Sequence, residues 1–196
     1  PLAGMDVQLA MALREAPEAL RPRLAHMRKA STRLTRVVQA LLSMFRSGLG
    51  PQRQWVVLTD LLSSLPTSHL QVVCEGETTC HADPDLLAAV LMNLLDNAQR
   101  HGARQVVLRL SRGQGVTCLA LCDDGEGCDA PTRDRLRSAL AQQDQGPGGL
   151  NGLGLVLADL VVRAHDGRLE LPEVTQGFVV RLCWPDAGQG SPSDTP

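Results

Sequence analysis

Apolar residues recur three and four positions apart along residues 83–101, D-P-D-L-L-A-A-V-L-M-N-L-L-D-N-A-Q-R-H, and this spacing predicts one amphipathic helix. Asp83 is a good N-cap residue, and Pro84 suits the first helical position because an N–H group there would have no partner. The apolar stripe consists of Leu87, Leu91, Leu94, Leu95 and Ala98.

The opposite face of this helix carries an unusual polar row. Asn93, Asn97 and Arg100 fall together at i, i+4 and i+7, with His101 at the border. Considered alone, the row is explained most simply as the solvated face of a half-buried helix. Its function therefore depends on which other motifs the chain brings to it.

The first fifty residues predict a helical hairpin. Residues 2–15 have a helical apolar face, residues 16–22 form a break with two prolines, and residues 23–47 form a longer helix. The longer helix has a heptad-like seam, which predicts pairing with a second copy in a four-helix bundle; the alternative is a hairpin packed on its own domain. The seam positions are Leu24, Met27, Ser31, Leu34, Val38, Leu41 and Phe45.

The rest of the chain alternates short strand patterns with helical ones. We expect a largely antiparallel sheet with helices on one face, an α+β sandwich. The expected strands are 55–58, 69–74, 77–81, 104–111, 116–123, 168–172 and 177–184, and the expected helices are 59–65, 132–140 and 153–165. The predicted divisions are a hairpin at 1–47, a linker at 48–53, a catalytic domain at 54–185 and a disordered tail at 186–196.

Composition narrows the possible partners. Aromatic residues make up 2% of the chain and Tyr is absent, so stacking platforms for single-stranded nucleic acid are not expected. The net charge is −2, with the positive excess in the first fifty residues, which is typical of a solvated helical face rather than a nucleic-acid patch. Without a signal peptide or a membrane-spanning apolar run, we expect no membrane contact by this stretch and a cytoplasmic location.

The six cysteines show no metal-binding spacing. None forms a C-x-x-C pair, and no Cys/His arrangement matches a zinc site. Several lie in apolar runs such as V-T-C-L-A-L-C. We therefore predict that they are small buried residues in a reducing compartment.

Two glycine-containing motifs follow the long helix. The sequence D-D-G-E-G at 123–127 ends a predicted strand, and G-L-G-L at 152–155 opens a predicted helix. Each motif is weak alone, since D-D-G-E-G also occurs in ordinary turns. The spacing lacks the Glu of an EF-hand, and the second motif lacks both the G-K-[ST] of a P-loop and the strand-then-G-x-G-x-x-G order of a dinucleotide fold.

Taken in order, these three elements resemble the N-box, G1-box and G2-box of the GHKL family of ATP-binding proteins, and most closely the bacterial sensor histidine kinases. The family's dimerisation hairpin carries an H-[EQ]-L-R-T-P-L motif in its first helix, and the start of this chain at Pro1-Leu2 is similar to the end of that motif. The second predicted helix also resembles the family's, in the sequence R-L-T-R-V-V-Q-A-L-L-S-M-F-R. The resemblance implies a GHKL (Bergerat) α/β sandwich and a phosphoacceptor histidine upstream of Pro1. His26 does not match that histidine.

The resemblance also implies roles for the polar row. Asn97 matches the residue that binds Mg²⁺, and Asn93 matches the second asparagine, which helps to hold Mg²⁺ or its water. Arg100 matches a position that contacts phosphate, and His101 matches one that borders the nucleotide. For His101, a helix-terminal role near the negative end of the dipole is an equally good interpretation. Amide oxygens and a guanidinium suit these tasks chemically.

The glycine motifs would hold the two ends of ATP. Asp123 is expected to accept the exocyclic N–H of adenine, while Gly125 and Gly127 let backbone pass close to the ring. Backbone N–H groups at Gly152, Leu153, Gly154 and Leu155 would bind phosphate at a helix N-terminus. Residues 128–151 would form the lid, with Gly148 and Gly149 as hinges.

The chain departs from the family in its lid. Gly149-Leu150-Asn151 stands where Gly-Gly-[ST] is usual, and Leu136 and Leu140 replace the aromatic F-box. The predicted lid is also short. These differences affect lid closure and catalytic rate more than nucleotide binding.

The resemblance implies the kinase core of a two-component sensor. It would transfer the γ-phosphoryl group of ATP to the upstream histidine of a homodimer, for relay to an aspartate in the receiver domain of a response regulator, with a membrane-anchored sensor in the full-length protein. Two alternatives stay open. A GHKL ATPase would carry Glu where Asn93 stands, as a base for water. A non-catalytic module would use the fold only for nucleotide binding or dimerisation.

Overall fold

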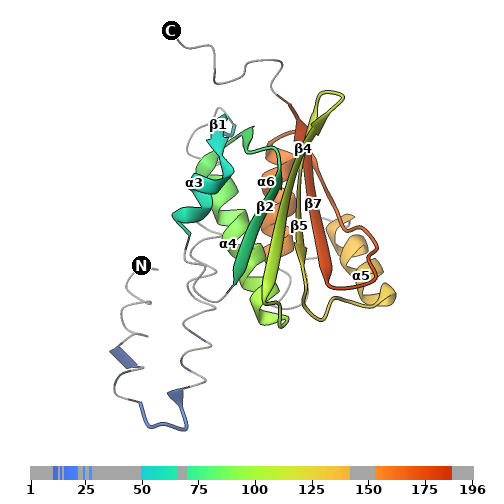
Figure 1. Ribbon diagram of the computed structural model, residues 1–196. Helices are drawn as coiled ribbons and strands as arrows, with labels where there is room; N and C mark the ends of the chain where they lie inside the picture. Colours follow the sequence, from blue (N-terminus) through green and yellow to red (C-terminus); the bar gives the residue numbers. More distant parts are fainter. Residues whose placement is uncertain are drawn as a thin grey trace. The chain divides into compact units, whose positions relative to one another are not determined.

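The computed structural model describes residues 11–12, 14, 16–21, 24, 27, 50–65, 70–141 and 153–186 (Figure 1). The chain forms two compact units, Pro1–Gly48 and Leu49–Pro196. In the first unit, the described residues are helical at 11, 12 and 14, form a turn at 18–20, and are helical again at 21, 24 and 27. The described residues exclude most of the predicted hairpin seam, His26, residues 142–151 of the predicted lid, Gly152 and the predicted tail from 187 onward.

The second unit contains four helices and seven strands in its described part. In chain order they are β1 (Gln54–Val57), α3 (Leu58–Ser63), β2 (Gln71–Gly76), β3 (Thr79–Ala82), α4 (Pro84–Arg100), β4 (Gln105–Gly113), β5 (Val116–Asp123), α5 (Ala130–Ala141), α6 (Leu153–Ala164), β6 (Arg168–Glu170) and β7 (Phe178–Pro185). Within the part of the chain that the structure describes, no helix is long and apolar enough to cross a membrane.

Five of the strands form one mixed sheet in the order β2-β4-β5-β7-β6, and β1 and β3 pair separately. Among the described strands, only the β2–β4 pair is parallel, and the other pairs are antiparallel. Figure 1 shows α4 and α6 together on one face of the sheet. Burial alternates along β4 accordingly, since Val106, Leu108 and Leu110 are buried while Arg109 and Ser111 are exposed. The predicted α+β sandwich is confirmed.

The core lies between the sheet and the α4–α6 pair, and its α4 side is the stripe that periodicity predicts. Leu91 is fully buried on α4, and Leu157 and Ala158 are fully buried on α6. Burying one such leucine stabilises the fold by about 1.5–3 kcal/mol. The core therefore fixes α4 and α6 against each other.

Polar contacts fix the first turn of α4 as well. Asp83 caps the helix as predicted, because its Oδ1 accepts from the backbone N–H groups of Asp85 and Leu86, both at 3.1 Å. Its Oδ2 accepts from Gln52 N at 2.8 Å. Its own backbone N–H donates to Nε2 of His165 at 3.0 Å.

His165 joins the end of α6 to this cap. It is 3% exposed, and its Nδ1 lies 2.8 Å from the carbonyl oxygen of Val161. Since Nε2 accepts from Asp83, the ring is neutral with its proton on Nδ1. Burial lowers the pKa of His165 below its ordinary value. Nearby, Arg53 pairs with Asp166 at 2.7 Å, so the chain entering the domain is bound to both helices.

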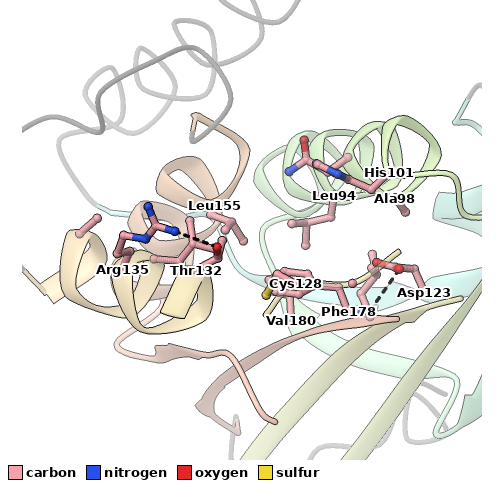
Figure 2. A pocket seen from close by; sticks show the side chains of 15 residues that line it. Leu94, Ala98, His101, Asp123, Cys128, Thr132, Arg135, Leu155, Phe178 and Val180 are labelled. Atoms are coloured by element: carbon pink, nitrogen blue, oxygen red, sulfur yellow. Dashed lines mark hydrogen bonds between the residues drawn. The ribbon is translucent and has the colours of Figure 1, made fainter. Parts of the chain in front are cut away.

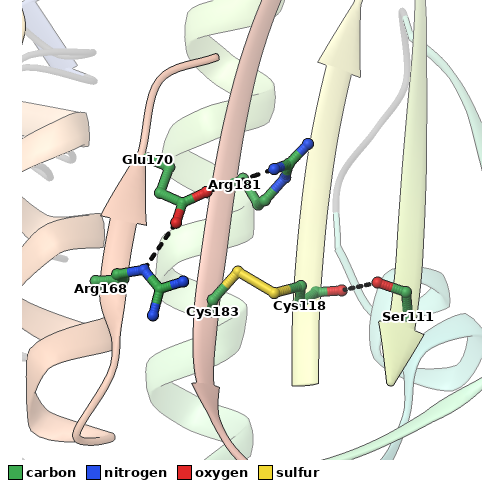
Figure 3. The surroundings of a disulfide bond; sticks show 6 residues. All are labelled: Ser111, Cys118, Arg168, Glu170, Arg181 and Cys183. Carbon is green, nitrogen blue, oxygen red and sulfur yellow. Dashed lines mark hydrogen bonds and ion pairs between the residues drawn. A yellow bond between two sulfur atoms is a disulfide. The ribbon is translucent and has the colours of Figure 1, made fainter. Parts of the chain in front are cut away.

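The prediction that the cysteines are buried and reduced is wrong for five of the six. Cys74, Cys122 and Cys128 are only partly buried, and Cys118 and Cys183 form a disulfide (Figure 3). The antiparallel register of β5 and β7 sets them opposite each other, with their Cα atoms 4.2 Å apart. They are 65 positions apart in the chain, so no local spacing reveals the pair. The remaining cysteines are free thiols: Cys74, Cys80, Cys122 and Cys128.

Candidate functional site

A pocket of about 580 Å³ opens between α4, α5, the first turn of α6 and the sheet (Figure 2). Its volume suits a small organic ligand. Most of its wall is apolar. The lining residues are Leu94, Asn97, Ala98, His101, Leu121, Asp123, Gly127, Cys128, Thr132, Arg135, Leu136, Ala139, Leu155, Phe178 and Val180.

Asp123 is the carboxylate of this pocket. Its Oδ1 accepts backbone N–H groups from Gly125 at 2.9 Å and Phe178 at 3.2 Å. Its Oδ2 has no protein partner among the described residues, so it can accept a hydrogen bond from a ligand. Burial raises the pKa of Asp123 above its ordinary value, and the two backbone hydrogen bonds partly offset that effect.

Glycines bring the chain after β5 close to its neighbours. A Cβ on Gly125 would lie 2.6 Å from the carbonyl oxygen of His101 at the end of α4. Gly127 has a φ of +68°, and a Cβ there would collide with the carbonyl oxygen of Gly177. The D-x-G-x-G pattern is thus required by close backbone approach at both glycines. Of the two, only Gly127 lines the pocket.

The N-terminus of α6 meets the polar row of α4. A Cβ on Gly154 would lie 2.8 Å from Nδ2 of Asn97, so glycine allows the two helices to touch at this point. Asn97 and Leu155 both line the pocket. Leu153 begins α6, and Gly152 lies outside the described residues. The N-box and the start of the G2-box are therefore neighbours in space.

Asn93 lies one turn earlier and is fully buried. Its Nδ2 donates to the carbonyl oxygen of Ala89 at 2.8 Å, whereas its Oδ1 has no hydrogen-bond partner in the described part of the chain. A buried acceptor without a partner lowers the stability of the fold, so its presence needs an explanation, such as a role in binding a ligand. A neutral amide oxygen is a donor that Mg²⁺ accepts, so the two asparagines fit that ion chemically.

Arg100 and His101, the two remaining predicted residues of this helix, differ in whether they line the pocket. His101 follows the last helical residue and lines the pocket. Arg100 is exposed and is not among the lining residues. Periodicity placed Arg100 on the same face as the asparagines, but the pocket extends from Asn97 toward His101 and α5 instead.

Helix α5 lies within the predicted lid and forms one wall of the pocket, but three of its four lining residues were not predicted. Thr132, Arg135, Leu136 and Ala139 line the pocket from α5, at positions i, i+3, i+4 and i+7 of that helix. Of the two leucines that replace the F-box, Leu136 lines the pocket and Leu140 does not. The helical spacing of these four positions was the available signal, but α5 is mostly exposed and its apolar pattern is weak.

Two arginines, the buried Arg133 and the exposed Arg137, attach α5 to the domain. Arg133 is 5% exposed, and its Nη2 donates to the carbonyl oxygen of Cys128 at 3.2 Å. Arg137 donates to the carbonyl oxygen of Leu171 at 2.6 Å. The wall is therefore held against both the G1 loop and the β6–β7 connection.

The family comparison agrees with this geometry. Residues 82–188, more than half of the chain, match the model of the histidine kinase-, DNA gyrase B- and HSP90-like ATPase family. The chain belongs to this family. It carries a histidine kinase-type ATP-binding catalytic domain, as the resemblance of the three boxes predicted.

The curated relatives include a bacteriophytochrome and a probable sensor histidine kinase. The chain is 28% identical to a bacteriophytochrome of Pseudomonas aeruginosa, over 86% of this chain and 26% of the relative. It is 28% identical to the probable sensor histidine kinase TcrY of Mycobacterium tuberculosis, over 93% of this chain and 42% of the relative. The chain thus spans less than half the length of these relatives.

Solved structures share the fold. The Acinetobacter baumannii histidine kinase AdeS matches with a TM-score of 0.63 and 14% identity, over 94% of this chain and 95% of that one. Full-length ShkA in complex with AMPPNP matches with a TM-score of 0.60 and 21% identity, over 97% of this chain and 46% of that one. These matches confirm the predicted GHKL fold.

Proposed function

We propose that the unit Leu49–Pro196 binds ATP with Mg²⁺ and is the catalytic core of a two-component sensor kinase. The observation that carries this proposal is the arrangement around Asp123. One carboxylate oxygen is held by two backbone N–H groups. The other has no partner among the residues that the structure describes, and it lies in a pocket bounded by Asn97 and the start of α6. This is the pattern needed to read the amino group of adenine while phosphates lie at a helix N-terminus.

The proposed orientation follows from the ends of the pocket. Adenine lies against Asp123 and the apolar side chains of Leu94 and Phe178, and the phosphates lie toward Asn97 and the first turn of α6. Asn97 and Asn93 would hold Mg²⁺, which neutralises phosphate charge when bound. The chain's own residues contribute chiefly positioning and charge stabilisation, which dominate phosphoryl transfer.

The rest of the proposal comes from the relatives. We infer a homodimer through the hairpin, transfer of the γ-phosphoryl to a histidine upstream of Pro1, and relay to a response-regulator aspartate. The phosphoryl transfer would take place in the cytoplasm, in a full-length protein that is anchored in the inner membrane. Asn93 disfavours an ATPase, because an amide cannot take a proton from water.

Calorimetric titration of the intact chain with ATP and GTP, each with and without Mg²⁺, tests the proposal. We expect ATP to bind, Mg²⁺ to tighten binding, and GTP to bind at least about tenfold more weakly, because its carbonyl cannot donate to Asp123. Equal binding of both nucleotides would contradict the base assignment.

A phosphate-release assay addresses the reaction. With labelled ATP, a longer version of the protein that includes the upstream histidine should become labelled on that histidine, and the present chain should release little free phosphate. Steady phosphate release without labelling would favour the ATPase. Nucleotide binding with neither reaction would favour the non-catalytic module.

A further inference from the structure

Arg135 is an exposed residue of α5 whose side chain lines the pocket. Its Nη2 donates to Oγ1 of Thr132 at 3.1 Å, and its Nε donates to the carbonyl oxygen of Pro131 at 3.3 Å. These bonds hold the side chain along its own helix. A guanidinium has five N–H donors, so Nη1 and one hydrogen of Nη2 have no partner within the described part of the chain.

Arg135 lies at one end of the pocket. Figure 2 shows Arg135 and Thr132 beside Leu155 on one side, with Asp123 on the opposite side. Leu155 belongs to the first turn of α6, where unpaired backbone N–H groups and the helix dipole favour an anion. Arg135 therefore lies at the end where the proposed function puts the phosphates.

No other lysine or arginine among the described residues lines this pocket. Arg100, the cation that the sequence suggested, is not on the wall. Asp129 attracts Arg135 electrostatically, but that carboxylate is exposed and already accepts from Thr132 N at 2.9 Å. Water screens such an exposed attraction, so Asp129 leaves the guanidinium able to bind a stronger anion.

We propose that Arg135 binds the phosphates of the nucleotide, so that the site binds ADP and ATP more tightly than adenosine. This proposal rests on the proposed function. A guanidinium binds phosphate oxygens through two parallel N–H···O bonds, which are stronger than bonds between neutral groups. Adenosine has no such oxygens and gains nothing from Arg135. The arginines that attach α5, Arg133 and Arg137, keep this cation at a fixed place on the wall.

Calorimetry on the intact chain with adenosine, ADP and ATP tests the assignment. In Arg135→Gln, we expect the affinity for ADP and ATP to fall about 10- to 100-fold, because a charge-assisted bond is lost. Adenosine affinity should stay within about twofold of wild type, which a general loss of structure would not produce. Arg135→Lys should recover part of the ATP affinity, because it keeps the charge but not the two-bond geometry.

Two matched variants separate this role from a general effect of charge. Arg109→Gln removes a positive charge from the other face of the sheet, where Arg109 pairs with Glu75 at 2.7 Å, and should leave all three affinities unchanged. Arg100→Gln tests the competing cation. The assignment to Arg135 is overturned if Arg135→Gln binds ATP as wild type does, or if only Arg100→Gln weakens ATP. A wild-type chain that binds adenosine and ATP equally also overturns it, whereas one that binds neither overturns the proposed function itself.

Discussion

The two ends of α4 differ in how completely their polar groups are satisfied. At the first turn, Asp83 is 7% exposed, and both carboxylate oxygens and its backbone N–H are hydrogen-bonded. Toward the other end, Asn93 Oδ1 is buried and has no hydrogen-bond partner among the described residues, and Asn97 and His101 line the pocket. One end of the helix is therefore built for stability and the other for a ligand.

The unsatisfied amide oxygen of Asn93 lowers the stability of the fold, and the bonded groups of Asp83 raise it. A satisfied buried hydrogen bond stabilises the fold by about 1 kcal/mol, whereas a buried acceptor without a partner costs about 1–3 kcal/mol. The tightly bonded first turn offsets that cost and holds α4 against α6. Mutations at the two ends should therefore separate stability from binding.

The largest effect on stability is expected at the first turn. Asp83→Ala removes the cap and the bond to Gln52, and should lower the free energy of unfolding by about 2–3 kcal/mol. Chemical denaturation measures this. Asp85→Ala, at an exposed position of the same turn, is the control and should cost no more than about 1 kcal/mol. Similar losses in both variants would show that the cap network is unimportant.

Asn93→Leu should give the opposite result. Replacing an amide that has one oxygen unsatisfied by an apolar residue of similar size should leave the free energy of unfolding unchanged or raise it by about 1 kcal/mol. ATP affinity in the presence of Mg²⁺ should nevertheless fall about tenfold or more. Calorimetry and denaturation on the same sample decide the matter, and a strongly destabilised variant would contradict the interpretation of Oδ1.

Gly154→Ala should produce a smaller loss of binding. The added Cβ would lie 2.8 Å from Nδ2 of Asn97, and this side-chain end can move, so the fold should tolerate the change. Displacing Asn97 should weaken ATP binding by about fivefold. Gly113→Ala is the matched control, because a Cβ there has no neighbour within 4 Å among the described residues. Unaltered ATP binding by Gly154→Ala would place the nucleotide away from Asn97.

The smallest effect is a pH dependence at the stable end. Because burial lowers the pKa of His165, its contribution to stability is present above the unfolded-state pKa of about 6.5 and is lost as pH falls through the lower folded-state pKa. Between pH 7.5 and 5.5 the free energy of unfolding should drop by about 1 kcal/mol. His165→Gln should flatten the dependence of the unfolding free energy on pH, and the control His81→Gln should flatten it less. An unchanged pH profile in His165→Gln would contradict a neutral His165 ring between Asp83 and Val161.

Local signals account for the elements that were predicted well. The expected cap at Asp83, the Pro84 start and the apolar stripe all belong to one helix, so no distant residue was needed to place α4. Strand β5 likewise has the expected bounds, 116–123. The parallel pairing of β2 with β4 was not predicted, because strand patterns do not specify their neighbours.

The parts of the site that were missed depend on distant contacts. Phe178 and Gly177 reach Asp123 from the other end of the chain, and only the β5–β7 register brings them there. The Cys118–Cys183 disulfide depends on the same register. Arg135 was missed because it lies on a mostly exposed helix, whose orientation is set by contacts with the β6–β7 connection.

A crystal structure of the chain with a non-hydrolysable ATP analogue and Mg²⁺ tests the central claim most directly. We predict that the adenine amino group donates to Oδ2 of Asp123 and that the phosphates lie between Asn97 and the first turn of α6. An analogue bound elsewhere, or a pocket filled by the chain's own residues at saturating analogue, would contradict the account.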